Sequence, residues 1–195
     1  MKKLFYISCL LFFTTCNKEE CTDYKGYPSE VGKIILSRCA TTGCHTDAAK
    51  EAAAGLSMES WTSLFKGSRY GNTAVIPYRA DYSFLTYFVN TYSDLGPIVP
   101  PSMPPNETPL TREEVLTIQN WINNGAPANN GLVKWNNYHG KKMLIVNQGC
   151  DNVFIVDSET GLVMRSVEIG TSSNIESPHY IEFSPDGEYF YVCFY

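Results

Sequence analysis

The feature that most constrains this chain is a short segment in which two cysteines and a histidine lie close together. Cys39 and Cys44 have four residues between them, and His45 follows the second cysteine directly. A group that bound all three side chains would fix the path of this segment. A second segment, residues 100–105, places Met103 between two pairs of prolines. Proline fixes its own φ angle and restricts the residue before it, so this loop should hold its methionine in a defined position.

Two cysteines followed directly by a histidine are typical of covalent haem attachment, in which both thiols bond to the porphyrin and the histidine ligates the iron. The usual motif has two residues between the cysteines, so the four found here are a departure from it. Met103 is the predicted second axial ligand, because a thioether is a soft ligand that raises the reduction potential of haem iron. The sequence therefore predicts one haem c, bonded to Cys39 and Cys44 and ligated by His45 and Met103.

Two other interpretations of these cysteines stay open. A disulfide between Cys39 and Cys44 would give a haem-free surface lipoprotein. A zinc site would need four sulfur or imidazole ligands, and the chain offers Cys21 in addition to Cys39, Cys44 and His45. That spacing is unlike the spacing of the common zinc modules.

Two segments have the periodicity of amphipathic helices. Residues 28–38 place apolar side chains at helical spacing and run into Cys39, with Ser29 as a candidate N-cap. Residues 110–125 carry a capping box at Thr111 and Glu114 and end at a glycine. The apolar face of this second helix consists of Val115, Ile118, Trp121 and Ile122.

With these segments in order, residues 28–128 resemble the monohaem cytochrome c domains of large secreted proteins from Bacteroidetes and Planctomycetes. The resemblance implies an all-α cytochrome c domain that carries electrons. Besides the cysteines, His45 and Met103-Pro104-Pro105, it rests on Gly55-Leu56 with Trp61, Ile76-Pro77, Ser83 with Leu85, Trp121-Ile122 and Gly125-Ala126.

Haem carries two propionate carboxylates, and four residues are candidates to contact them. Arg79 and Arg69 could pair with a propionate, whereas Tyr78 and Trp121 could donate a hydrogen bond.

The amino terminus predicts export. Residues 1–15 have a short basic start and an apolar stretch too short to span a bilayer, so they are expected to be a signal peptide. Cys16 is the expected lipidation site, and residues 16–27 would form a tether to the outer membrane, facing the periplasm or the cell surface. Haem attachment also needs export, so the two predictions agree. Three cysteines have no predicted role: Cys21, Cys150 and Cys193.

The second half of the chain changes from helical periodicity to short β-rich runs. Residues 129–137 read as a linker, and residues 138–195 contain five such runs separated by turn residues. The segments 139–145 and 186–192 are similar to each other, which suggests a repeat. These runs resemble the Tyr-Val-Thr-Asn family of β-propeller repeats. The expected fold class is therefore an all-α cytochrome c domain followed by an all-β partial β-propeller, with about one blade visible and the rest in a longer protein.

The predicted function is electron transfer between redox partner proteins that the sequence does not identify. An alternative is the electron-feeding domain of a haem- or quinone-dependent propeller oxidoreductase, so the sequence leaves open whether the protein is an enzyme. The net charge of −5 argues against nucleic acid as a partner.

Overall fold

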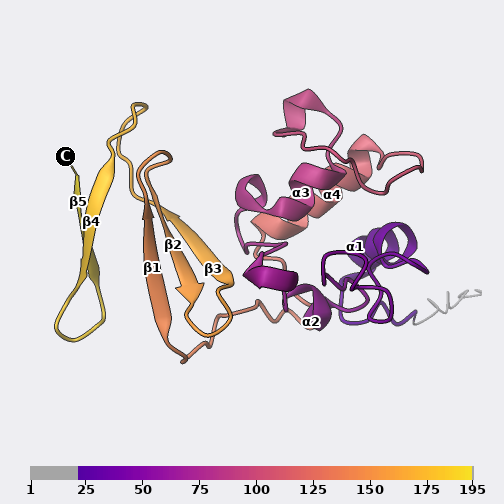
Figure 1. The fold of residues 1–195 in the computed structure, drawn as a ribbon, viewed down its shortest axis with the longest axis horizontal. Coiled ribbons are helices and arrows are strands. Elements are labelled where there is room, and N and C mark those ends of the chain that lie inside the picture. Colours follow the sequence, from indigo (N-terminus) through magenta and orange to yellow (C-terminus); the bar gives the residue numbers. More distant parts are fainter. Residues whose placement is uncertain (1–21, 195) are drawn as a thin grey trace, which may run out of the picture.

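The computed structural model describes residues 22–194, without the side chain of Tyr70. This part of the chain forms four short α-helices and then five antiparallel strands (Figure 1). The helices are α1 Ser29–Ile34, α2 Trp61–Leu64, α3 Phe84–Val89 and α4 Arg112–Asn123. The strands are β1 Lys142–Asn147, β2 Asn152–Asp157, β3 Val163–Glu168, β4 Pro178–Phe183 and β5 Phe190–Phe194.

The expected all-α domain over residues 28–128 is wrong. Three of the four helices span only four to six residues, and α4 alone reaches 12 residues. Turns, bends, loops and single helical turns connect them, including a π-helical turn over Ile35–Cys39 directly after α1. Helices this short are not stable alone in water, so tertiary packing must hold them. Proline-rich loops and left-handed glycines, such as those on either side of Met103 and at Gly55, stop longer helices from forming.

The structure confirms the predicted limits and buried face of α4. Thr111 accepts from the backbone of Glu114, whose side chain accepts in turn from the backbone of Thr111. Gly125 follows the helix with φ +95°, as its role as a C-terminal stop requires. The predicted N-cap of α1 is wrong, because Pro28 holds that position and Ser29 is the first helical residue. All four predicted apolar residues of α4 are buried: Val115, Ile118, Trp121 and Ile122.

One hydrophobic core joins these helices to the loops between them. Two buried tryptophans connect this core to the segment after α4 through their indole N–H groups. Trp61 donates to the carbonyl of Ala126, and Trp121 donates to the carbonyl of Pro127, each at 2.9 Å. Tyr27 donates to the carbonyls of Met58 and Ser60. Side chains thus satisfy backbone carbonyls that no helix or sheet would otherwise pair.

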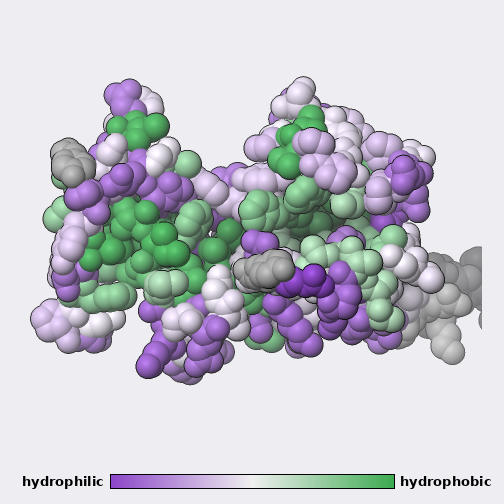
Figure 2. Space-filling view, viewed as in Figure 1, coloured by the Kyte–Doolittle hydropathy of each residue, from purple (hydrophilic) through white to green (hydrophobic). Residues whose placement is uncertain are grey.

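The strands form two separate antiparallel arrangements. Strands β1, β2 and β3 make a three-stranded sheet in chain order, whereas β4 and β5 form a hairpin. The predicted β-rich runs are strands. In the described residues they form one small sheet and one hairpin, and not the expected propeller blade followed by the start of a second blade. Figure 2 shows a broad hydrophobic area over these strands, and exposed side chains on them include Met143, Ile145 and Phe183.

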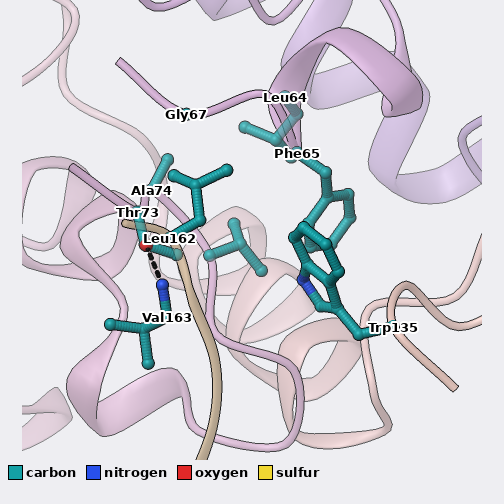
Figure 3. Close-up of a pocket in the computed structure, with 9 residues that line it drawn as sticks. Leu64, Phe65, Gly67, Thr73, Ala74, Trp135, Leu162 and Val163 are labelled. Atoms are coloured by element: carbon teal, nitrogen blue, oxygen red, sulfur yellow. Dashed lines mark hydrogen bonds between the residues drawn. The ribbon is translucent and has the colours of Figure 1, made fainter. Parts of the chain in front are cut away.

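The three-stranded sheet packs against the helical part, by which we mean the segment that contains α1 to α4, through a few specific contacts. Leu162 is buried beside Gly67, and the backbone N–H of Val163 donates to the Thr73 hydroxyl at 2.8 Å (Figure 3). A cavity of about 10 Å³ remains between these residues and Trp135, which is about the size of one water molecule. Both parts therefore belong to one packed unit.

None of the described helices combines the length and the apolar character that crossing a bilayer would require.

Candidate functional site

A cavity of about 570 Å³ lies within the helical part, and residues from both predicted motif segments line it. This volume is in the range of pockets that hold organic cofactors. Figure 2 shows hydrophobic residues around a hollow between the α3 part and the α1 part of the chain. The lining includes Cys39, Cys44, His45 and Met103 together with apolar residues, among them Leu56, Met58, Phe84, Leu85, Phe88 and Val89.

The two cysteines reach this cavity from the end of the π-helical turn and from the loop after it. Cys39 is the last residue of that turn and is only 6% exposed, whereas Cys44 is partly exposed. Both are free thiols. Burial raises the pKa of the Cys39 thiol to about 12, so this group stays protonated at neutral pH.

His45 is held by three hydrogen bonds that leave one ring nitrogen available. Its backbone N–H donates to the carbonyl of Cys39 at 3.1 Å, and its carbonyl accepts from Met58 at 2.7 Å. Its Nδ1 lies 3.1 Å from the carbonyl of Leu56, which can only accept, so Nδ1 carries the proton. In the neutral imidazole with this tautomer, the other nitrogen, Nε2, carries the lone pair, which is the arrangement found in metal-bound histidines.

Met103 belongs to a loop that is attached to α3. Its backbone N–H donates to the carbonyl of Phe88 at 2.8 Å, and Val99 donates to the carbonyl of Tyr87 at 3.2 Å. Four side chains of α3 also line the cavity: Phe84, Leu85, Phe88 and Val89. The position of the thioether thus depends on α3 as well as on the prolines.

One charged residue that lines the cavity was not among the predicted site residues. Arg38 lines the cavity directly before Cys39, and its Nη2 donates to the carbonyl of Thr108. Its Nε is buried and has no hydrogen-bond partner. Its position next to the first cysteine was the only signal of it in the sequence.

The four predicted propionate contacts lie elsewhere, and none of them lines the cavity. Arg79 pairs with Asp81 and Glu168, and Arg69 pairs with Glu51. Tyr78 packs beside Gly125 and lies under the guanidinium of Arg165. Trp121 is in the core, where its indole is bonded as described above.

Residues 22–194 contain no group of three or more histidines, cysteines and acids that could hold a metal ion. For the zinc interpretation, this means that Cys39, Cys44 and His45 do not converge on one point within the described part. Cys16, the predicted lipidation site, and Cys21 lie outside the described residues. Cys150 and Cys193 are exposed free thiols.

No family model, no curated protein and no solved structure matches this chain. The structure shows that the resemblance to a monohaem cytochrome c domain followed by a Tyr-Val-Thr-Asn propeller is wrong. The short helices and long loops over residues 28–128, and the arrangement of the strands in one small sheet and one hairpin, contradict it independently. The quoted motifs occur in order, but the chain between them does not take the fold that the resemblance implied.

Proposed function

We propose that this protein binds one haem covalently and transfers electrons, in a fold of short helices packed against a small sheet. The observation that carries the proposal is the single cavity lined by Cys39, Cys44, His45 and Met103. These residues come from two segments more than fifty positions apart in the sequence. The donor set of two thiols, one imidazole and one thioether is that of a haem c site.

The residues of the cavity fit this cofactor in three respects. The volume of about 570 Å³ and the mostly apolar lining suit a large planar ring. The Nδ1–H of His45 is bonded to Leu56, which leaves Nε2 free for iron. The thiols of Cys39 and Cys44 are unpaired and therefore available for thioether bonds.

When bound, haem iron supplies a reversible one-electron change between the ferrous and ferric states. The role of the protein would be to hold the iron with the imidazole of His45 and the thioether of Met103, and an iron held by both would have no open position for a substrate. The apolar side chains of α3 would exclude water and favour the ferrous state together with the thioether. This arrangement favours electron transfer over catalysis at the iron.

The proposal includes export and a lipid anchor. Thioether attachment takes place outside the cytoplasm, and the apolar stretch before Cys16 provides a route there. The protein would then lie on the outer membrane and exchange electrons with other proteins. The support for this part comes from the sequence alone.

The test is to express the full chain in a host whose periplasm contains the haem-attachment machinery. We expect a coloured protein whose haem remains attached after denaturation, with the pyridine haemochrome spectrum of two thioether bonds. Cys39→Ser and Cys44→Ser should each remove one thioether bond. Cys150→Ser, in the turn between β1 and β2, and Cys193→Ser, on β5, are matched controls and should leave the spectrum unchanged.

The axial ligands have their own test. Met103→Ala should abolish the absorption band of the thioether–iron bond, whereas Met143→Ala, an exposed methionine on β1, should preserve it. A colourless full chain with a Cys39–Cys44 disulfide in the mass spectrum would overturn the proposal. So would stoichiometric zinc in a colourless protein.

A further inference from the structure

Arg38 has a feature that the contacts of the folded chain do not explain. Its Nε is buried and has no hydrogen-bond partner, whereas its Nη2 donates to the carbonyl of Thr108. Buried N–H groups in native proteins almost always have a partner, and an exception calls for a missing one. The exception here occurs on a side chain that lines the large cavity.

The charge of the residues that line the cavity indicates what kind of group the missing hydrogen-bond partner is. Among the described lining residues, Arg38 is the one side chain that is always charged, and no aspartate or glutamate lies with it. A cation facing an otherwise apolar pocket favours an anion there. A planar guanidinium with a free N–H is well suited to a carboxylate.

We propose that Arg38 binds a propionate carboxylate of the haem through its free Nε–H. This inference rests on the proposed function and adds a binding residue to it. Because the same guanidinium bonds Thr108, in the segment after Met103, Arg38 also connects the carboxylate to the loop that positions the axial methionine. Arg38 would thus take the role that the sequence suggested for Arg79 and Arg69.

The test uses the haem-loaded full chain with ¹³C in the propionate carboxylates and records infrared spectra as a function of pH. In the wild type, we expect one propionate to stay ionised to low pH, because the adjacent positive charge lowers its pKa. In Arg38→Gln, the band of this carboxylate should shift and its protonation should move to higher pH. Arg38→Lys should largely restore the protonation pH, since it keeps the charge, but not the band position.

Arg112→Gln is the matched control, because Arg112 pairs with Asp94 away from the cavity and should leave both propionate bands unchanged. Coloured Arg38→Gln with wild-type bands and titration would overturn this inference and leave the proposed function standing. A wild type without covalent haem would instead overturn the proposed function.

If Arg38→Gln does not fold, ¹⁵N-arginine spectra of the wild type test whether Arg38 contacts the propionate. The Nε–H resonance of Arg38 should move with the propionate titration in the haem-loaded protein. A resonance that is independent of that titration would contradict the proposed contact.

Discussion

At the scale of single residues, the environment of each side chain determines what it can do in the cavity. Cys39 and Cys44 are close in sequence, yet one is buried and the other is partly exposed. His45 has one ring nitrogen bonded to Leu56 and the other left free. The pattern of cysteines and histidine predicted which residue types would meet, but it could not predict these differences in exposure and hydrogen bonding.

The burial of Cys39 leads to a prediction about pH. In the haem-free chain, the thiol keeps its proton up to a pKa of about 12, against an ordinary value of 9.0 in the unfolded chain. Folding stability is therefore unaffected by this group below pH 9.0 and falls as the pH rises from there toward 12, by up to about 1.4 kcal/mol per pH unit. Urea unfolding of the haem-free wild type and of Cys39→Ala at several alkaline pH values should show a smaller loss in the variant.

Tyrosines and lysines titrate in the wild type and in Cys39→Ala alike. Only the difference between the two proteins in the slope of unfolding free energy against pH therefore reports on Cys39. Equal slopes would show that the thiol is not buried in the folded chain.

At the scale of secondary-structure elements, α4 is the helix whose sequence carries the most local information. It has a capping box, a regular apolar face and a glycine after its end. The shorter helices lack a side-chain cap, except for α2, in which Ser60 accepts from Ser63. Their positions follow from packing rather than from local preference, which explains why the sequence predicted too much helix around them.

The capping box of α4 can be tested by substitution. Thr111→Ala removes the hydroxyl that accepts from the backbone of Glu114, and we expect a loss of about 0.5–2 kcal/mol in the free energy of unfolding. Thr111→Ser is the matched control, because serine is an equally good cap, and it should stay near the wild-type value. Chemical denaturation measures both. A Thr111→Ala variant as stable as the wild type would mean that the cap contributes nothing here.

At the scale of the whole molecule, the contact between the helical part and the sheet combines a buried leucine, an aromatic pair and an ion pair. Leu162 is 4% exposed and touches the turn at Gly67. Arg79 lies over the ring of Tyr82, which in turn contacts Phe154 of β2 edge to face. Burial of apolar surface, rather than the ion pair of Arg79 with Glu168, should provide most of the stabilisation.

Two substitutions separate these contributions. Leu162→Ala should lower the free energy of unfolding by about 2–5 kcal/mol, because it leaves a cavity at the contact. Glu168→Gln should cost less than about 1 kcal/mol, since the carboxylate is largely exposed and water screens the ion pair. Denaturant titrations of both variants check this. A larger loss of stability from Glu168→Gln than from Leu162→Ala would show that the ion pair, and not the burial of apolar surface, provides most of the stabilisation.

The sequence by itself determined the elements that rest on local rules. The capping box and apolar face of α4, its glycine stop and the five β-rich runs all depend on neighbouring residues, and all appear where they were predicted. It also made Cys39, Cys44, His45 and Met103 the candidate site residues, since the chemistry of thiols, imidazole and thioether is a property of the residue type.

Only the tertiary structure decided how these pieces combine. The fold of residues 28–128, the arrangement of the strands, the cavity lined by His45 and Met103, and the buried Nε of Arg38 all depend on contacts between residues distant in the chain. Such contacts are selected by packing and by the pairing of buried polar groups, and neither leaves a periodic trace in the sequence. For this reason, the arginines that looked suitable by type, Arg79 and Arg69, bind acids elsewhere.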